Sequence, residues 1–210
     1  GEGRVGVMFF EIFMQRLGFL SNIEGGVCME RMGAATKGSM GKRRRLRMVI
    51  PAYPAFNIYS GIANVTTALG PVSVATSVHE MEGWDVEVID ENNYRRSAPK
   101  DDSGLPDHEA LQRLRPADVV GFYGGLSSTI PRLYAIARFY QGQQIPTIAG
   151  GQHFVEESIE EGLRNGIDVI VLGEGEEAIK ELLCAFEGKR RPSEVPGIAY
   201  RDHDQRVQTR

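Results

Sequence analysis

The chain has 210 residues, 41% of them hydrophobic, and carries a formal net charge of -4 at pH 7. This length supports one domain with a substantial core, and the acidic balance argues against general nucleic-acid binding. Two cysteines, Cys28 and Cys184, exclude a disulfide framework and a multi-cysteine metal or iron–sulfur site. Without a signal peptide, or an apolar run of the roughly 20 residues that a membrane helix needs, we expect a cytoplasmic protein.

The first 41 residues differ in composition from the rest of the chain. An apolar stretch at Val5–Leu20 is followed by a glycine-rich stretch that ends at Gly41. We expect residues 1–41 to be a leader, flexible or vector-derived, and residues 42–210 to form a single binding domain. The alternative is a helix at Val5–Leu20 that packs on the domain or on a partner.

A basic cluster opens the predicted domain, and alternating strands and helices follow it. We expect this cluster to be a solvated lead-in to the first strand rather than a nucleic-acid patch; its members are Lys42, Arg43, Arg44, Arg45 and Arg47. Short apolar runs predict five strands, at Leu46–Ala52, Asp85–Ile89, Asp118–Tyr123, Pro146–Ala149 and Ile167–Leu172. Helical periodicity predicts inward-facing residues in the intervening segments, among them Leu111, Leu114, Val155, Ile159 and Leu163.

The alternation predicts an α/β fold. Right-handed crossovers would give a five-stranded parallel sheet in the order 2-1-3-4-5, with helices on both faces. Pro192–Gln208 carries two short apolar runs around a polar turn, which predicts a small C-terminal β-hairpin.

Four loops are expected to meet at the carboxyl edge of this sheet, where open α/β sheets bind ligands. They contain glycines, which leave the backbone accessible to a large ligand, together with hydroxyl and carboxylate side chains. The candidate binding residues are Tyr53, Gly124, Gly125, Ser127, Ser128, Thr129, Gly150, Gly151, Gln152, His153, Gly173, Glu174, Gly175 and Glu176.

Several of these residues have a structural interpretation beside the functional one. Three consecutive hydroxyls at Ser127–Thr129 could cap a helix or contact a ligand. Glu174 and Glu176 are better explained by the helix dipole than by acid–base catalysis. His153 fits a capping role as well as a cofactor contact. We find no catalytic set and no metal-ligand spacing.

Five motifs and the helix expected from Gly70-Pro71, in their order and spacing, resemble the cobalamin (vitamin B12)-binding domain that precedes the catalytic barrel in many radical S-adenosylmethionine enzymes. The resemblance covers about residues 46–208. The motifs are Trp84-Asp85-Val86-Glu87-Val88-Ile89-Asp90, Asp118-Val119-Val120-Gly121-Phe122, Gly150-Gly151-Gln152-His153, Gly173-Glu174-Gly175-Glu176-Glu177 and Pro196-Gly197-Ile198-Ala199-Tyr200-Arg201.

The resemblance implies a flavodoxin-like (Rossmann-like) sheet with the corrin ring across its carboxyl edge and the nucleotide tail along the glycine turns. Many cobalamin domains carry Asp-x-His-x-x-Gly after the first strand, where the histidine ligates cobalt. This chain has Pro51-Ala52-Tyr53-Pro54-Ala55-Phe56 there, which implies cobalamin without a histidine lower ligand.

The family's cluster motif, Cys-x-x-x-Cys-x-x-Cys, is also missing from the sequence. We therefore expect a fragment that binds but does not catalyse. S-adenosylmethionine and a [4Fe-4S] cluster would belong to a C-terminal barrel of the same polypeptide, and the chemistry would be methyl transfer or a related radical step. The alternatives are a flavodoxin-like module that binds a nucleotide or flavin, and a ligand-free interaction domain.

Overall fold

The computed structural model describes residues 43–55, 61, 66–93, 99–202 and 207–209. The expected leader at 1–41 lies outside the described residues, as do Lys42 and most of the connection between Tyr53 and Leu69. Within the described part of the chain, no helix is long and apolar enough to cross a membrane.

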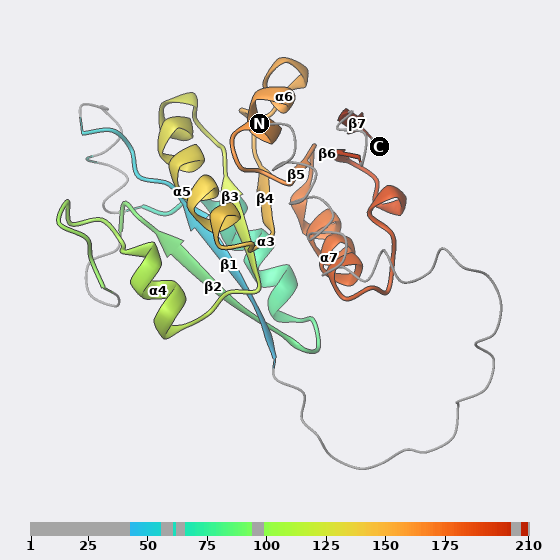
Figure 1. Cartoon of the computed structure of the whole chain (residues 1–210), viewed down its shortest axis with the longest axis horizontal. Coiled ribbons are helices and arrows are strands. Elements are labelled where there is room, and N and C mark those ends of the chain that lie inside the picture. Colours follow the sequence, from blue (N-terminus) through green and yellow to red (C-terminus); the bar gives the residue numbers. More distant parts are fainter. Residues whose placement is uncertain (1–42, 56–60, 62–65, 94–98, 203–206, 210) are drawn as a thin grey trace, which may run out of the picture.

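One mixed sheet organises the domain (Figure 1), with the strand order β2-β1-β3-β4-β5-β6-β7. Its parallel part comprises β1 (Arg44–Ile50), β2 (Trp84–Asp90), β3 (Val119–Tyr123), β4 (Thr147–Gly150) and β5 (Val169–Val171). The hairpin of β6 (Ile198–Arg201) and β7 (Val207–Thr209) continues the sheet antiparallel to β5. The predicted strand order and the predicted hairpin are both confirmed.

Helices cover both faces of this sheet. One face carries α3 (Leu69–His79) and α7 (Gly175–Phe186), which pack against each other. The other face carries α4 (His108–Leu114), α5 (Ile130–Gly142) and α6 (Glu156–Arg164). Two short 3-10 helices, η1 (Ser127–Thr129) and η2 (Pro192–Glu194), complete the described elements.

The two-residue period of the strands divides the apolar side chains between two cores. In β5, Val169 and Val171 belong to the core under α3 and α7, and Ile170 belongs to the core under α5 and α6. Ile148 and Ala149 of β4 separate in the same way. Strands buried on both faces are expected in a parallel sheet, and their nearly continuous apolar runs follow from this burial.

Three positions differ from the sequence-based expectations. Arg47 is not part of a solvated lead-in, because its side chain is 0% exposed beneath α4. Leu114 is 69% exposed, because α4 ends there after a single buried turn that contains His108 and Leu111. Val155 is 57% exposed, because α6 begins at Glu156 and Val155 precedes its first turn.

Candidate functional site

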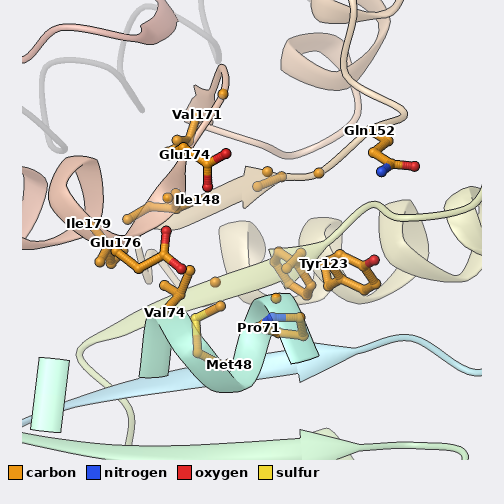
Figure 2. A pocket seen from close by; sticks show the side chains of 18 residues that line it. Met48, Pro71, Val74, Tyr123, Ile148, Gln152, Val171, Glu174, Glu176 and Ile179 are labelled. Carbon is orange, nitrogen blue, oxygen red and sulfur yellow. The ribbon is translucent and has the colours of Figure 1, made fainter. Parts of the chain in front are cut away.

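A pocket of about 380 Å³ opens at the carboxyl edge of the sheet, on the face that α3 and α7 cover (Figure 2). The ends of β3, β4 and β5 form its floor, and the first turns of α3 and α7 form its sides. It is lined by Met48, Gly70, Pro71, Val74, Gly121, Phe122, Tyr123, Ile148, Ala149, Gly150, Gly151, Gln152, Val171, Gly173, Glu174, Gly175, Glu176 and Ile179.

The larger side chains that line the pocket are mostly apolar. Ile148 and Val171 come from neighbouring strands, and Val74 and Ile179 come from the two helices. Met48 reaches the floor from β1 across Gly121, where a Cβ atom would lie only 2.5 Å from the methionine sulfur. The pocket can therefore bury a flat apolar group of moderate size, since small-molecule sites typically enclose about 300–1,000 Å³.

Glycine lets α7 approach α3 and leaves room at the pocket mouth. At Gly175 a Cβ atom would lie 2.9 Å from Cγ2 of Val74, so a side chain there would push the two helices apart. At Gly173 a Cβ atom would meet nothing within 4 Å, but the φ angle of +89° disfavours other residues. No side chain therefore projects into the pocket mouth from position 173.

Gly151 has a structural role as well as a place in the pocket lining. Its φ angle is +118°, and a Cβ atom there would lie 2.7 Å from the carbonyl oxygen of Gly124. The Gly124 amide donates to the Gly150 carbonyl oxygen over 2.7 Å, and the His153 amide donates to the Gly124 carbonyl oxygen over 2.9 Å. The loops after β3 and β4 therefore touch backbone to backbone.

Two carboxylates, of Glu174 and Glu176, lie at the helical side of the pocket (Figure 2). Hydrogen bonds from the Ser73 side chain and from the backbone amides at Gly175 and Glu176 lower the pKa of Glu176. Glu176 thus holds its negative charge at the N-terminus of α7, which the helix dipole favours. This geometry supports the dipole interpretation of Glu176 over a role in proton transfer.

The predicted hydroxyl residues lie outside the lining of this pocket. Thr129 is buried, and its hydroxyl donates to the Leu126 carbonyl oxygen over 2.9 Å. The Ser127 hydroxyl lies 3.2 Å from Nδ1 of His153, so the loops after β3 and β4 also meet through side chains. Ser128 shares the same exposed turn.

His153 also lies beside the pocket rather than in its lining. Its ring packs edge-on against Phe154, and its buried Nε2 has no hydrogen-bond partner among the described residues. Tyr53 follows β1 at the same edge, where its amide donates to Oδ1 of Asn92 over 2.9 Å. Gly125 lies under the Tyr123 ring, since a Cβ atom there would be 2.3 Å from that ring.

The structure therefore brings seven of the fourteen predicted residues into the pocket lining: Gly150, Gly151, Gln152, Gly173, Glu174, Gly175 and Glu176. Sequence analysis missed the apolar lining, because a residue at the inner end of a buried strand has the pattern of ordinary core. One usable signal was the position of Tyr123 and Val171, each the last residue of a strand at the expected ligand edge.

Residues 60–183 match the family model of the B12 binding domain. The chain belongs to this family. The matched segment contains every lining residue of the pocket except Met48. A comparison with curated protein sequences gave no match.

Solved structures with the same fold include cobalamin-dependent radical S-adenosylmethionine enzymes. OxsB with aqua-cobalamin bound gives a TM-score of 0.58 at 16% identity, covering 80% of this chain and 22% of OxsB. The radical S-adenosylmethionine methyltransferase TsrM from Kitasatospora setae, with cobalamin and a [4Fe-4S] cluster bound, gives 0.54 at 20% identity, covering 78% of this chain and 28% of TsrM. This B12-binding chain therefore spans about a quarter of the length of those enzymes.

Proposed function

We propose that this chain binds cobalamin at the carboxyl edge of its sheet, as one domain of a radical S-adenosylmethionine enzyme. The observation that carries the proposal is the pocket between α3 and α7, which lies almost wholly within the segment that matches the B12-binding family. Parallel α/β sheets bind ligands at this edge, where strand ends and helix N-termini converge.

The pocket fits one end of cobalamin by size and polarity. The benzimidazole base of the nucleotide tail is flat, apolar and compatible with about 380 Å³, whereas the corrin ring with its amide side chains is much larger. We place the base among Met48, Ile148 and Val171, and the corrin ring over the loops at the edge. Exposed Leu69, 83% accessible, and Leu126, 41% accessible, offer apolar surface beside that edge.

The histidines of the described residues support binding without a histidine lower ligand. His79 is at the C-terminal end of α3, toward the opposite edge, and His108 is buried against Glu91 and Tyr140. His153 contacts Ser127 and Phe154 outside the pocket lining. The segment after β1, where the family's cobalt-ligating histidine would stand, carries Tyr53.

The role of this domain in a longer enzyme follows from the chemistry of the cofactor. Bound cobalamin would supply a cobalt centre that can carry a methyl group or take part in radical steps. The residues of this chain would hold the nucleotide tail, exclude water from it and present one face of the corrin ring. We propose that a C-terminal radical S-adenosylmethionine barrel, with its own [4Fe-4S] cluster, provides the substrate site and catalyses methyl transfer or a related reaction.

A pocket-filling variant tests this function directly. At Gly150 a Cβ atom would lie 3.5 Å from Cβ of Val171, in ordinary contact, so Gly150→Val adds bulk to the pocket without a backbone clash. The control is Gly142→Val, because a Cβ atom at Gly142 in α5 would meet nothing within 4 Å. The chain is mixed with hydroxocobalamin, desalted and examined by visible spectroscopy, with urea unfolding measured in parallel.

We expect wild type and Gly142→Val to retain cobalamin, and Gly150→Val to remain folded and lose it. Equal retention by all three proteins would place the ligand elsewhere. Retention of flavin mononucleotide in place of cobalamin would favour a flavodoxin-like module, and retention of neither would favour an interaction domain.

A further inference from the structure

A chain of buried polar side chains crosses the domain beneath α4 and ends at the carboxyl edge of the sheet. Nη1 of Arg47, in β1, lies 2.8 Å from the Tyr140 hydroxyl of α5. That hydroxyl lies 2.9 Å from Nδ1 of His108, at the start of α4. Nε2 of His108 lies 3.2 Å from Oε1 of Glu91, which directly follows β2. All four residues are buried.

The two ends of this chain fix the direction of every hydrogen bond in it. A guanidinium can only donate, so the Tyr140 hydroxyl accepts from Arg47 and its proton is free to point at His108. Burial raises the pKa of Tyr140 despite the nearby Arg47, so the hydroxyl keeps this proton. Nδ1 of His108 then accepts, and its Nε2 carries the hydrogen that is donated to the Glu91 carboxylate.

In the other protonation states of His108, a buried polar group has no hydrogen-bond partner. A proton on Nδ1 would oblige the Tyr140 hydroxyl to accept from both neighbours, so its own hydrogen would be buried without an acceptor. An Nε2 without a hydrogen would place its lone pair against a lone pair of the Glu91 carboxylate, which is repulsive. Leaving a buried polar group unpaired is costly, and the neutral Nε2–H tautomer is the form that pairs every polar group in the chain.

Glu91 connects this hydrogen-bond chain to the segment after β1. Its Oε2 accepts from the Ala52 amide over 2.9 Å, and both carboxylate oxygens accept from Arg132, over 2.6 and 3.0 Å. Burial alone would raise the pKa of Glu91, but hydrogen bonds from His108, Arg132 and the Ala52 amide, together with the charge of Arg132, lower it. The neighbouring Asn92 accepts from the Tyr53 amide, so two successive amides are held.

We propose that His108 and Tyr140 are positioning residues for the cofactor edge. Their directional hydrogen-bond chain holds the ionised Glu91 carboxylate against the Ala52 amide, and so fixes the segment that carries Tyr53 at the carboxyl edge of the sheet. Neither residue lines the pocket. This inference rests on the proposed cobalamin binding, and it adds residues that the pocket itself does not identify.

The test uses the full 210-residue chain and measures tautomer, affinity and stability separately. Nitrogen NMR of histidine-labelled protein near neutral pH reports the tautomer of His108. Cobalamin affinity and urea midpoints are measured for Tyr140→Phe and Glu91→Gln. Two matched controls, Thr147→Val and Asp168→Asn, change a buried hydroxyl and a carboxylate at the opposite edge, where Thr147 and Asp168 contact each other.

We expect the neutral Nε2–H form of His108 in the wild-type chain. Loss of one charge-assisted hydrogen bond should weaken cobalamin binding roughly tenfold in Glu91→Gln and by a smaller factor in Tyr140→Phe, with both controls at wild-type affinity. If Glu91→Gln does not fold, the cobalamin affinity of Tyr140→Phe and the tautomer of His108 test the positioning role.

Two results would overturn the positioning role alone. One is an Nδ1–H or doubly protonated His108; the other is wild-type affinity in both test variants while the wild-type chain binds cobalamin. No cobalamin binding by the wild-type chain would overturn the proposed function and the positioning role together.

Discussion

Two acidic side chains, Glu91 and Asp168, lie at opposite edges of the same sheet, and their environments have opposite effects on their charge. Glu91, after β2, accepts hydrogen bonds from His108, Arg132 and the Ala52 amide, and its pKa is lowered. Asp168, before β5, is held by the amide and hydroxyl of Thr147 and by the Gln141 side chain, none of them charged. Burial outweighs these bonds and raises the pKa of Asp168 to about 6.

The difference shows what a buried carboxylate needs in order to stay ionised. Neutral donors orient Asp168 but do not offset the loss of hydration, whereas a guanidinium against Glu91 does. The charged and fixed carboxylate lies at the edge where we place the cofactor. Its counterpart at the far edge, Asp168, joins the starts of β4 and β5, and no cation among the described residues pairs with it.

The largest expected effect comes from removing Glu91. Glu91→Ala would leave Arg132, His108 and the Ala52 amide without their acceptor, and should lower the free energy of unfolding by about 3–5 kcal/mol. Asp168→Ala leaves only neutral donors unpaired and should cost about 1 kcal/mol near neutral pH. Urea unfolding of both variants measures the difference, and equal losses would remove the distinction between the two edges.

The second prediction concerns the pH dependence of stability. Between the ordinary pKa of 3.8 and the folded value of about 6, Asp168 binds more protons in the folded state than in the unfolded state. Stability from this group therefore falls as pH rises through that window, by about 3 kcal/mol in total. Glu91 acts in the opposite sense: its contribution is complete above its ordinary pKa of 4.5 and is lost as pH falls below it.

The substitution Asp168→Asn removes the pH dependence of stability that comes from Asp168 and leaves the one that comes from Glu91. Urea midpoints from about pH 4 to about pH 7 should diverge, with the variant gaining on wild type as the pH rises. Parallel curves would mean that Asp168 titrates normally in the folded protein.

The sheet was predictable from the sequence, but the apolar lining of the pocket and the Glu91 cluster were not. Short apolar runs separated by helical periods leave few topologies, so the order of the five parallel strands followed from right-handed crossovers. Arg47 was assigned to the solvated basic cluster because sequence spacing does not show that α4 covers it, with Glu87 as its counter-charge. Likewise, Asp90-Glu91-Asn92-Asn93 has the composition of an ordinary polar turn.

The glycines of the turns after β4 and β5 share a place in the pocket lining, but they have different structural roles. The turns after β4 and β5 do line the pocket, as their sequence indicated. Yet Gly151 is also required by the Gly124 backbone, whereas a Cβ atom at Gly173 would point into open space. The sequence cannot separate these cases, because each depends on a neighbour far along the chain.

The third prediction compares two glycines at the two edges. Gly151, after β4, and Gly166, before β5, both have positive φ, at +118° and +95°. In each case a Cβ atom would lie 2.7 Å from backbone, at the Gly124 carbonyl oxygen or the Arg138 amide. Gly151→Ala and Gly166→Ala should therefore each lower the free energy of unfolding by about 2 kcal/mol.

Only the variant at the carboxyl edge should change ligand binding. We expect Gly151→Ala to lose cobalamin retention under conditions in which Gly166→Ala, equally destabilised, keeps it. Equal retention at matched stability would argue that the backbone at Gly151 has no part in the site.

The smallest effect is expected at His153, the histidine nearest the pocket. Its Nδ1 faces the Ser127 hydroxyl over 3.2 Å, its ring packs against Phe154, and it is outside the pocket lining. His153→Ala should therefore leave the cobalt-centred visible bands of bound aquacobalamin unchanged, although loss of the Ser127 contact lowers the urea midpoint slightly. The control is His79→Ala, at the C-terminal end of α3. A band shift in His153→Ala that His79→Ala lacks would make His153 a cobalt ligand, and would overturn binding without a histidine lower ligand.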